Sequence, residues 1–113
     1  MKYIIAVIQP DRIEDVLEAL DDEGIHLVTA SDIMGRGRQK GVAEIYRSHV
    51  EPGNLLRKVE LEIAVNDDYV SAAITTIARV AKTGNIGAGK VFVLELEQSL
   101  RMRTGETGSV AIG

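Results

Sequence analysis

The chain has 113 residues, with 13 basic and 17 acidic side chains and a formal net charge of −4. That length fits one domain, and a composition of 45% hydrophobic and 27% charged residues is typical of a folded globular protein. The absence of cysteine excludes a disulfide framework, a thiolate metal site and a cysteine nucleophile. No apolar run is long enough to span a membrane, and residues 1–10 lack a signal-peptide cleavage site. We therefore expect a cytoplasmic domain.

The first third of the chain predicts a strand, a helix and a second strand. Residues 3–8 form a continuous apolar run closed by Pro10, which is typical of a strand buried on both faces. From Asp11 onward, apolar residues recur at helical spacing as far as Leu20. Gly24 follows, at the point where a helix commonly ends in a left-handed residue. The apolar residues within 25–34 then predict the second strand.

The remaining elements repeat this pattern after a long irregular segment. Residues 58–65 alternate polar and apolar side chains, as a half-exposed strand does. Residues 66–68, Asn-Asp-Asp, offer N-caps for a helix that reaches about Lys82, and residues 91–96 predict a fourth strand. The order strand, helix, strand, strand, helix, strand predicts an α+β ferredoxin-like sandwich. Its antiparallel four-stranded sheet would carry both helices on one face. Because the first and fourth strands are apolar on both faces, we expect another subunit to cover the bare face.

Charge is distributed unevenly along the chain. Residues 35–58 contain six basic and two acidic side chains, a net charge of +4, so the rest of the chain carries −8. Within this segment residues 37–56 show no clear period, and loops of such length are usually functional or disordered. A basic segment on an acidic body indicates either a local anionic ligand or a solvated arginine-rich loop.

Two short segments, 35–38 and 87–90, combine glycine with basic residues, and a third, 101–103, carries two arginines just before Gly105. Glycine-rich backbone can turn several N–H groups toward phosphate oxygens, and guanidinium groups suit bidentate phosphate contacts. Their alternate spacing predicts that Arg101 and Arg103 lie on the same side of an extended segment. Each segment alone also fits a tight hairpin, but the three together indicate a bound nucleotide.

The same segments resemble the PII signal-transduction family. Residues 35–47 (GRGRQKGVAEIYR) resemble the start of its T-loop, and residues 83–93 (TGNIGAGKVFV) resemble its B-loop. Residues 101–106 (RMRTGE) resemble its C-terminal phosphate-binding segment. The resemblance covers residues 1–113 as a single PII-like domain. It implies a T-loop at about 37–56, a B-loop at about 82–90 and a C-terminal loop at about 98–113.

The resemblance also implies a function. Members of the family are non-catalytic homotrimers that bind ATP or ADP between subunits and sense 2-oxoglutarate together with Mg-ATP. Their T-loop binds target proteins, including ammonium transporters and enzymes of nitrogen metabolism. We therefore expect a cytoplasmic regulator that reaches a membrane only through a partner protein and binds no nucleic acid.

Site residues follow by correspondence with the family's motifs. The implied nucleotide-binding residues are Thr29, Gly37, Arg38, Glu62, Ala64, Gly87, Ala88, Gly89, Lys90, Arg101 and Arg103, the two arginines reaching in from a neighbouring subunit. The implied 2-oxoglutarate-binding residues are Gln39, Lys40, Lys58 and Gly87. Gln39 would also ligate Mg²⁺, which prefers oxygen ligands such as an amide. Tyr46 and Arg47 would contact the partner protein.

Two departures from the family pattern affect regulation. Modified members carry a tyrosine or a serine in the T-loop where this chain has Glu51 and His49, so we predict no covalent modification at either position. Ala88 replaces the usual aspartate of the B-loop, a change that bears on ligand response.

Alternative functions fit the sequence less well. One is a divergent paralogue that senses adenylate nucleotides or another metabolite for a metal or carbon transport system. A small phosphohydrolase would need a histidine or cysteine base beside the cations. A nucleic-acid module would need stacking aromatics on its central strands, and residues 59–65 have none.

Overall fold

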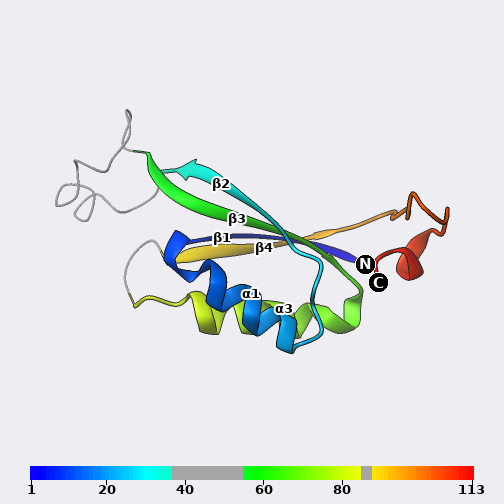
Figure 1. Ribbon diagram of the computed structural model, residues 1–113, viewed down its shortest axis with the longest axis horizontal. Coiled ribbons are helices and arrows are strands. Elements are labelled where there is room, and N and C mark those ends of the chain that lie inside the picture. Colours follow the sequence, from blue (N-terminus) through cyan, green and yellow to red (C-terminus); the bar gives the residue numbers. More distant parts are fainter. Residues whose placement is uncertain (37–54, 85–87) are drawn as a thin grey trace.

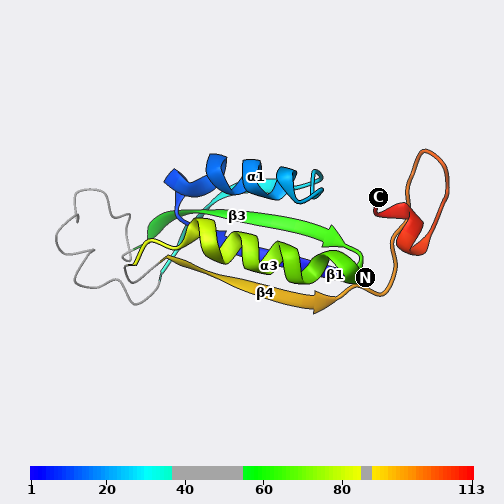
Figure 2. The ribbon, with the colours of Figure 1, turned by 90° about the horizontal axis from the view of Figure 1, so that it is seen from below.

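The computed structural model describes residues 1–36, 55–84 and 88–113. Its elements are β1 (Lys2–Ile8), the 3-10 helix η1 (Pro10–Arg12), α1 (Ile13–Asp22), β2 (Thr29–Gly35), β3 (Leu56–Val65), α3 (Asp67–Ala81), β4 (Gly89–Glu95) and the 3-10 helix η3 (Gly108–Ala111). The strands form one antiparallel sheet in the order β2-β3-β1-β4. Helices α1 and α3 lie side by side across one face of that sheet (Figures 1 and 2). The predicted ferredoxin-like sandwich is confirmed.

The core lies between the helices and one face of the two central strands. Ile4 on β1 faces Ile63 on β3, and Ala6 faces Leu61. Because side chains alternate along a strand, these residues point toward the helices and their sequence neighbours point to the open face. The core side chains, each at most 5% exposed, are Ile4, Ala6, Ile8, Val16, Leu20, Ile25, Val59, Leu61, Ile63, Val65, Ala73, Ile77 and Ala81.

Helix α1 ends at the predicted glycine, but β2 begins later than expected. Gly24 adopts φ +79°, its N–H donates to the carbonyl of Asp21, and the N–H of Ile25 donates to the carbonyl of Leu20. This is a Schellman cap, in which Ile25 and Leu20 are both buried. Ile25 therefore closes the helix instead of starting the strand, and β2 begins only at Thr29.

Two other boundaries differ from the prediction. β3 begins at Leu56 rather than at residue 58, and β4 begins at Gly89 rather than at residue 91. The last two residues of the predicted B-loop are therefore also the first two residues of β4. Gly89 and Lys90 belong to the sheet because they pair with Ile8 and Val7 of β1.

The face of the sheet opposite the helices is open in the single chain. Phe92 and Leu94 of β4, which pair with Ile5 and Tyr3, are 49% and 47% exposed. No helix in the described ranges is long and apolar enough to cross a membrane. The single chain therefore has the bare face that the sequence predicted, and the burial of that face by another subunit stays a prediction.

Candidate functional site

Three predicted nucleotide-binding residues lie together on the open face of the sheet. Thr29, the first residue of β2, pairs directly with Glu62 of β3. Ala64 follows Glu62 by two positions and therefore points to the same face. Glu62 and Ala64 on the central strand β3 are partly buried, whereas Thr29 on the edge strand β2 is exposed. The alternation of polar and apolar residues over 58–65 puts Glu62 and Ala64 on this face, and the pairing of Thr29 with Glu62 adds Thr29 to them.

Glu62 has a side-chain partner that the sequence did not suggest. The hydroxyl of Tyr3 on β1 donates a hydrogen bond to the Glu62 carboxylate. This hydrogen bond, burial and the negative charges of Glu62 and Glu60 together raise the pKa of Tyr3 to about 12. The Glu62 side chain is therefore held on the sheet. The alternation of residues 58–65 placed Glu62 on the polar side of its strand, but no sequence signal placed Tyr3 beside it.

The end of the B-loop presents a free cation beside a tightly packed glycine. Lys90 is exposed and has no hydrogen-bond or ion-pair partner in the described part of the chain. Gly89 adopts φ +128°, and a Cβ atom at that position would overlap the carbonyl oxygen of Val7. Glycine at 89 is thus required by the close approach of β4 to β1. Ala88 lies just before the strand and is partly buried.

Lys58, the predicted carboxylate-binding residue, lies at the opposite end of β3 from Ala64. It is only 7% exposed, and burial lowers the pKa of its ammonium group. A Cβ atom on the adjacent Gly35 would lie 3.4 Å from Lys58 Cγ, so the lysine stem packs along the glycine of β2. A buried ammonium group of this kind is stabilised by an approaching carboxylate.

Residues 99–108 form a hairpin, which we call the C-terminal arm. Leu100 and Thr107 form a β-bridge, and the N–H of Gly108 donates to the carbonyl of Ser99 at 2.9 Å. Residues 102–104 form the turn. The expectation that Arg101 and Arg103 lie on an extended segment is therefore wrong.

The two arginines of the arm have different surroundings. Arg101 Nη1 is 3.0 Å from Glu106 Oε1, and Arg101 Nη2 is 3.1 Å from the carbonyl oxygen of Val110. Arg103 lies in the turn, is exposed and has no partner among the residues that the structure describes. Sequence reasoning missed the role of Glu106, and the neighbouring Gly105 is the one residue that could have suggested a turn.

The arm is separated from the B-loop end of the sheet by the length of β4. It projects from the end of that strand remote from Lys90 (Figure 1). Seven residues of strand span roughly 20 Å. One chain therefore does not bring Arg101 or Arg103 to Lys90.

The segment that follows the arm is joined to the start of α3 by the side chain of Asn66. Asn66 is the residue before α3. The sequence predicts that residues 66–68 cap this helix, but the Asn66 side chain makes no hydrogen bond to its first turn. Its Nδ2 instead donates to the carbonyl of Ser109 at 3.0 Å. The start of α3 and the residues after the arm are thus joined.

The remaining predicted site residues lie outside the described residues: Gly37, Arg38, Gln39, Lys40, Tyr46, Arg47 and Gly87, together with Glu51 and His49. Their implied roles stay predictions.

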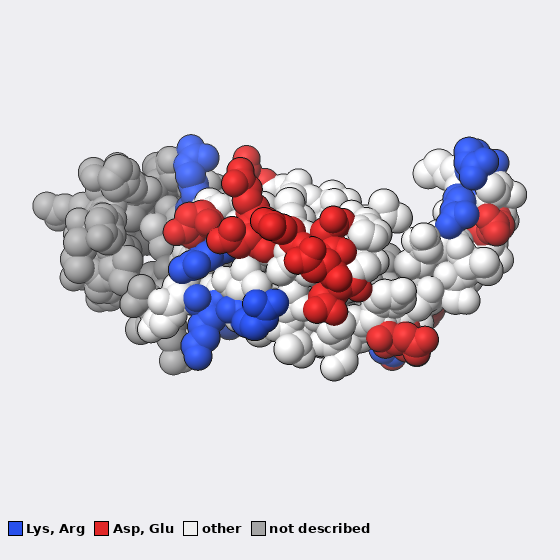
Figure 3. Space-filling model, turned by 60° about the horizontal axis from the view of Figure 1, so that its bottom comes forward, with Lys and Arg blue, Asp and Glu red and all other residues white. Residues whose placement is uncertain are grey.

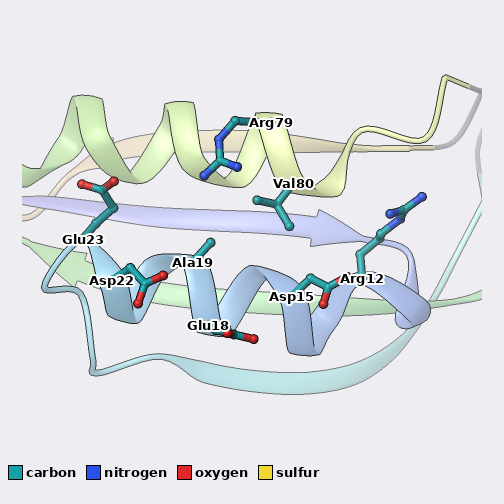
Figure 4. A pocket seen from close by; sticks show the side chains of 8 residues that line it. All are labelled: Arg12, Asp15, Glu18, Ala19, Asp22, Glu23, Arg79 and Val80. Atoms are coloured by element: carbon teal, nitrogen blue, oxygen red, sulfur yellow. The ribbon is translucent and has the colours of Figure 1, made fainter.

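A charged groove also lies on the helix face, away from these residues. Acidic side chains gather over the helix layer (Figure 3), and a hollow of about 470 Å³ lies between α1 and α3. It is lined by Arg12, Asp15, Glu18, Ala19, Asp22, Glu23, Arg79 and Val80, with Arg79 projecting from α3 toward α1 (Figure 4). Within residues 1–36, 55–84 and 88–113, no three His, Asp or Glu side chains are placed to hold a metal ion. The groove contains none of the predicted site residues.

Comparisons with known proteins agree with this arrangement. The family model described as "Nitrogen regulatory protein P-II" matches residues 1–106. The nitrogen regulatory protein P-II of Bradyrhizobium diazoefficiens is 46% identical over 112 residues, which are 99% of this chain and 100% of that protein. The nitrogen regulatory protein GlnK of Escherichia coli K12 is 43% identical with the same coverage. A crystal structure of Arabidopsis thaliana PII bound to citrate superimposes with a TM-score of 0.80 at 37% identity, covering 98% of this chain and 88% of that one. The chain therefore belongs to the nitrogen regulatory protein P-II family.

Proposed function

We propose that this protein is a non-catalytic nitrogen-regulatory sensor that binds ATP or ADP between the subunits of a homotrimer. With Mg-ATP bound it would also take 2-oxoglutarate, and residues 37–56 would then control a target transporter or metabolic enzyme. The observation that carries the nucleotide proposal is the free, exposed ammonium group of Lys90 on the same sheet face as Thr29, Glu62 and Ala64, among the residues that the structure describes.

The chemistry of these residues supports a nucleotide with several phosphates. Lys90 supplies a positive charge, and Arg103 supplies a guanidinium group that can contact two phosphate oxygens at once. Thr29, Glu62 and Ala64 supply hydroxyl and backbone groups of the kind that bind an adenine ring. The cations would bind the phosphates, and the paired strands would bind the base.

Assembly between subunits is supported by the position of the arm. Because the arm lies at the end of β4 remote from Lys90, both can contact one nucleotide only if the arm belongs to another copy of the chain. The exposed Phe92 and Leu94 add apolar surface that such an assembly would bury. Light scattering should give a mass about three times the 12.2 kDa of one chain. A monomer would contradict this part of the proposal.

A carboxylic acid is the class of effector that suits Lys58. Burial disfavours its charged form, and the carboxylate of 2-oxoglutarate would stabilise that form. The similar Arabidopsis PII was crystallised with a bound carboxylic acid, citrate, which supports this class. The amide oxygen of Gln39 is a suitable donor for Mg²⁺ between ATP and the effector.

Titration with ATP tests the nucleotide proposal. The wild-type protein should bind ATP, and Lys90→Gln should weaken binding by about tenfold or more, because one charge-assisted hydrogen bond to phosphate is lost. Arg79→Gln is the matched control, since Arg79 is an exposed cation in the helix layer on the other side of the sheet. We expect that control to bind ATP as the wild type does. Equal affinities of Lys90→Gln and wild type would reject the site, and no binding by the wild type would reject the function.

A further inference from the structure

One carboxylate of the C-terminal arm holds two side chains. Glu106 Oε1 accepts hydrogen bonds from Arg101 Nη1 at 3.0 Å and from Thr104 Oγ1 at 2.8 Å. The backbones of the same residues are joined as well, since the N–H of Arg101 donates to the carbonyl of Glu106 at 2.9 Å. Glu106 therefore lies across the base of the turn that carries Arg103.

The guanidinium group of Arg101 is held from two directions. Glu106 contacts one terminal nitrogen, and the carbonyl of Val110 contacts the other. A guanidinium group has five N–H donors, so these contacts fix its plane and leave three donors for another ligand. Holding the plane in advance reduces the entropy lost when a phosphate binds.

We infer that Glu106 is a positioning residue for the phosphate end of the nucleotide site, acting through Arg101. This inference rests on the proposed function, because it assumes that the arm contacts a nucleotide phosphate. Glu106 itself does not contact the nucleotide. Its carboxylate orients the Arg101 side chain, whose plane it fixes together with the carbonyl of Val110.

The direction in which ATP affinity changes when the Glu106 charge is removed distinguishes a positioning role from a purely electrostatic one. Removing a negative charge near a phosphate should strengthen binding if charge alone matters. Removing a positioning residue should weaken it. The Arg101 and Glu106 side chains are 35% and 42% exposed, so we expect a modest effect, a loss of about three- to fivefold in ATP affinity.

The experiment is a double-mutant cycle on ATP affinity. Glu106→Gln should bind ATP about three- to fivefold more weakly than wild type. Glu97→Gln is the matched control, because Glu97 is an exposed carboxylate between β4 and the arm with no partner among the described residues. That control should bind with unchanged or slightly higher affinity. In an Arg101→Gln background, Glu106→Gln should cause no further loss, because Glu106 acts through Arg101.

A second variant keeps the inference testable if Glu106→Gln does not assemble. Thr104→Val removes the other side-chain donor to Glu106 and should weaken ATP binding in the same direction, by a smaller factor. The ligand-free oligomer mass and melting temperature should be those of the wild type. If the variants lower the melting temperature but leave ATP affinity unchanged, Glu106 has only a structural role and the inference is wrong.

Other outcomes separate this inference from the proposed function. If the wild type binds ATP while Glu106→Gln and Glu97→Gln behave alike, the inference fails and the proposed function stands. Additive losses in Glu106→Gln and Arg101→Gln would also overturn it. If the wild type binds no ATP, both fail together.

Discussion

The hydroxyl of Tyr3 on β1 donates a hydrogen bond to the carboxylate of Glu62, diagonally across the pair in which Tyr3 faces Ala64. Ionisation of Tyr3 would remove the proton that it donates to Glu62 and leave a partly buried phenolate against that carboxylate, which is why the pKa of Tyr3 rises to about 12 from its ordinary 10.0. The pair joins the two central strands on the face that carries the predicted adenine-binding residues.

Replacing Tyr3 should change the response to alkaline pH. A phenol whose pKa is raised on folding stabilises the folded state fully below pH 10.0, and this contribution is lost as the pH rises toward about 12. Wild type should therefore lose stability over that range more steeply than Tyr3→Phe. Chemical unfolding of both proteins at a series of pH values measures the difference. Parallel pH curves would show that the hydrogen bond does not perturb Tyr3.

Replacing Gly89 should destabilise the sheet. In Gly89→Ala the new Cβ would overlap the Val7 carbonyl and the residue would keep an unfavourable φ, at a cost of about 2 kcal/mol or more. Gly84→Ala is the matched control, because Gly84 adopts φ +77° with no atom within 4 Å of its Cβ position. That control should cost only about 1 kcal/mol. If Gly89→Ala and Gly84→Ala lose the same unfolding free energy, β4 can shift away from β1 to make room for the new Cβ atom.

Mixed oligomers should recover binding sites that neither variant has alone. If each site combines Lys90 of one chain with Arg103 of the next, a trimer assembled from Lys90→Gln and Arg103→Gln chains contains some sites with both residues intact. Random mixing should restore about a quarter of the sites to wild-type ATP affinity. Titration of the co-refolded mixture, against each variant refolded alone, measures the recovered fraction. No recovery would mean that the Lys90 and Arg103 of one site come from the same chain.

Gln39 should distinguish the effector from the nucleotide. Its amide is expected to bind Mg²⁺ between ATP and 2-oxoglutarate, so Gln39→Ala should weaken 2-oxoglutarate binding by far more than ADP binding. Titrations with each ligand, using the same preparation, test this. Comparable losses for the two ligands would contradict the assigned role.

Periodicity predicted the elements well where burial is one-sided. Val16 and Leu20 fall on the buried stripe of α1, and the alternation of residues 58–65 gives the buried Leu61 and Ile63 of β3. Each buried side chain contributes through the apolar area removed from water, and a regular element must repeat that burial at its own period. This is why the order of elements and the fold class followed from the sequence.

Boundaries and side-chain partners could not be predicted in the same way. Ile25 is apolar in either role, so composition did not distinguish a helix cap from the start of β2. The arm shows the same limit, because Arg101 and Arg103 alternate as they would in a strand, whereas the turn depends on hydrogen bonds to Glu106. The family resemblance grouped Thr29, Glu62 and Ala64 as expected site residues, but the Tyr3 contact needed the register of β1 against β3.

The most direct test of the central claim is calorimetric titration of the purified protein with 2-oxoglutarate, in the presence and absence of Mg-ATP. An effector can act as a signal only through a difference in affinity between ligand states. We predict that ATP binds alone and that 2-oxoglutarate binds only when Mg-ATP is present. Binding of 2-oxoglutarate that is independent of Mg-ATP, or no binding of either ligand, would contradict the proposed function.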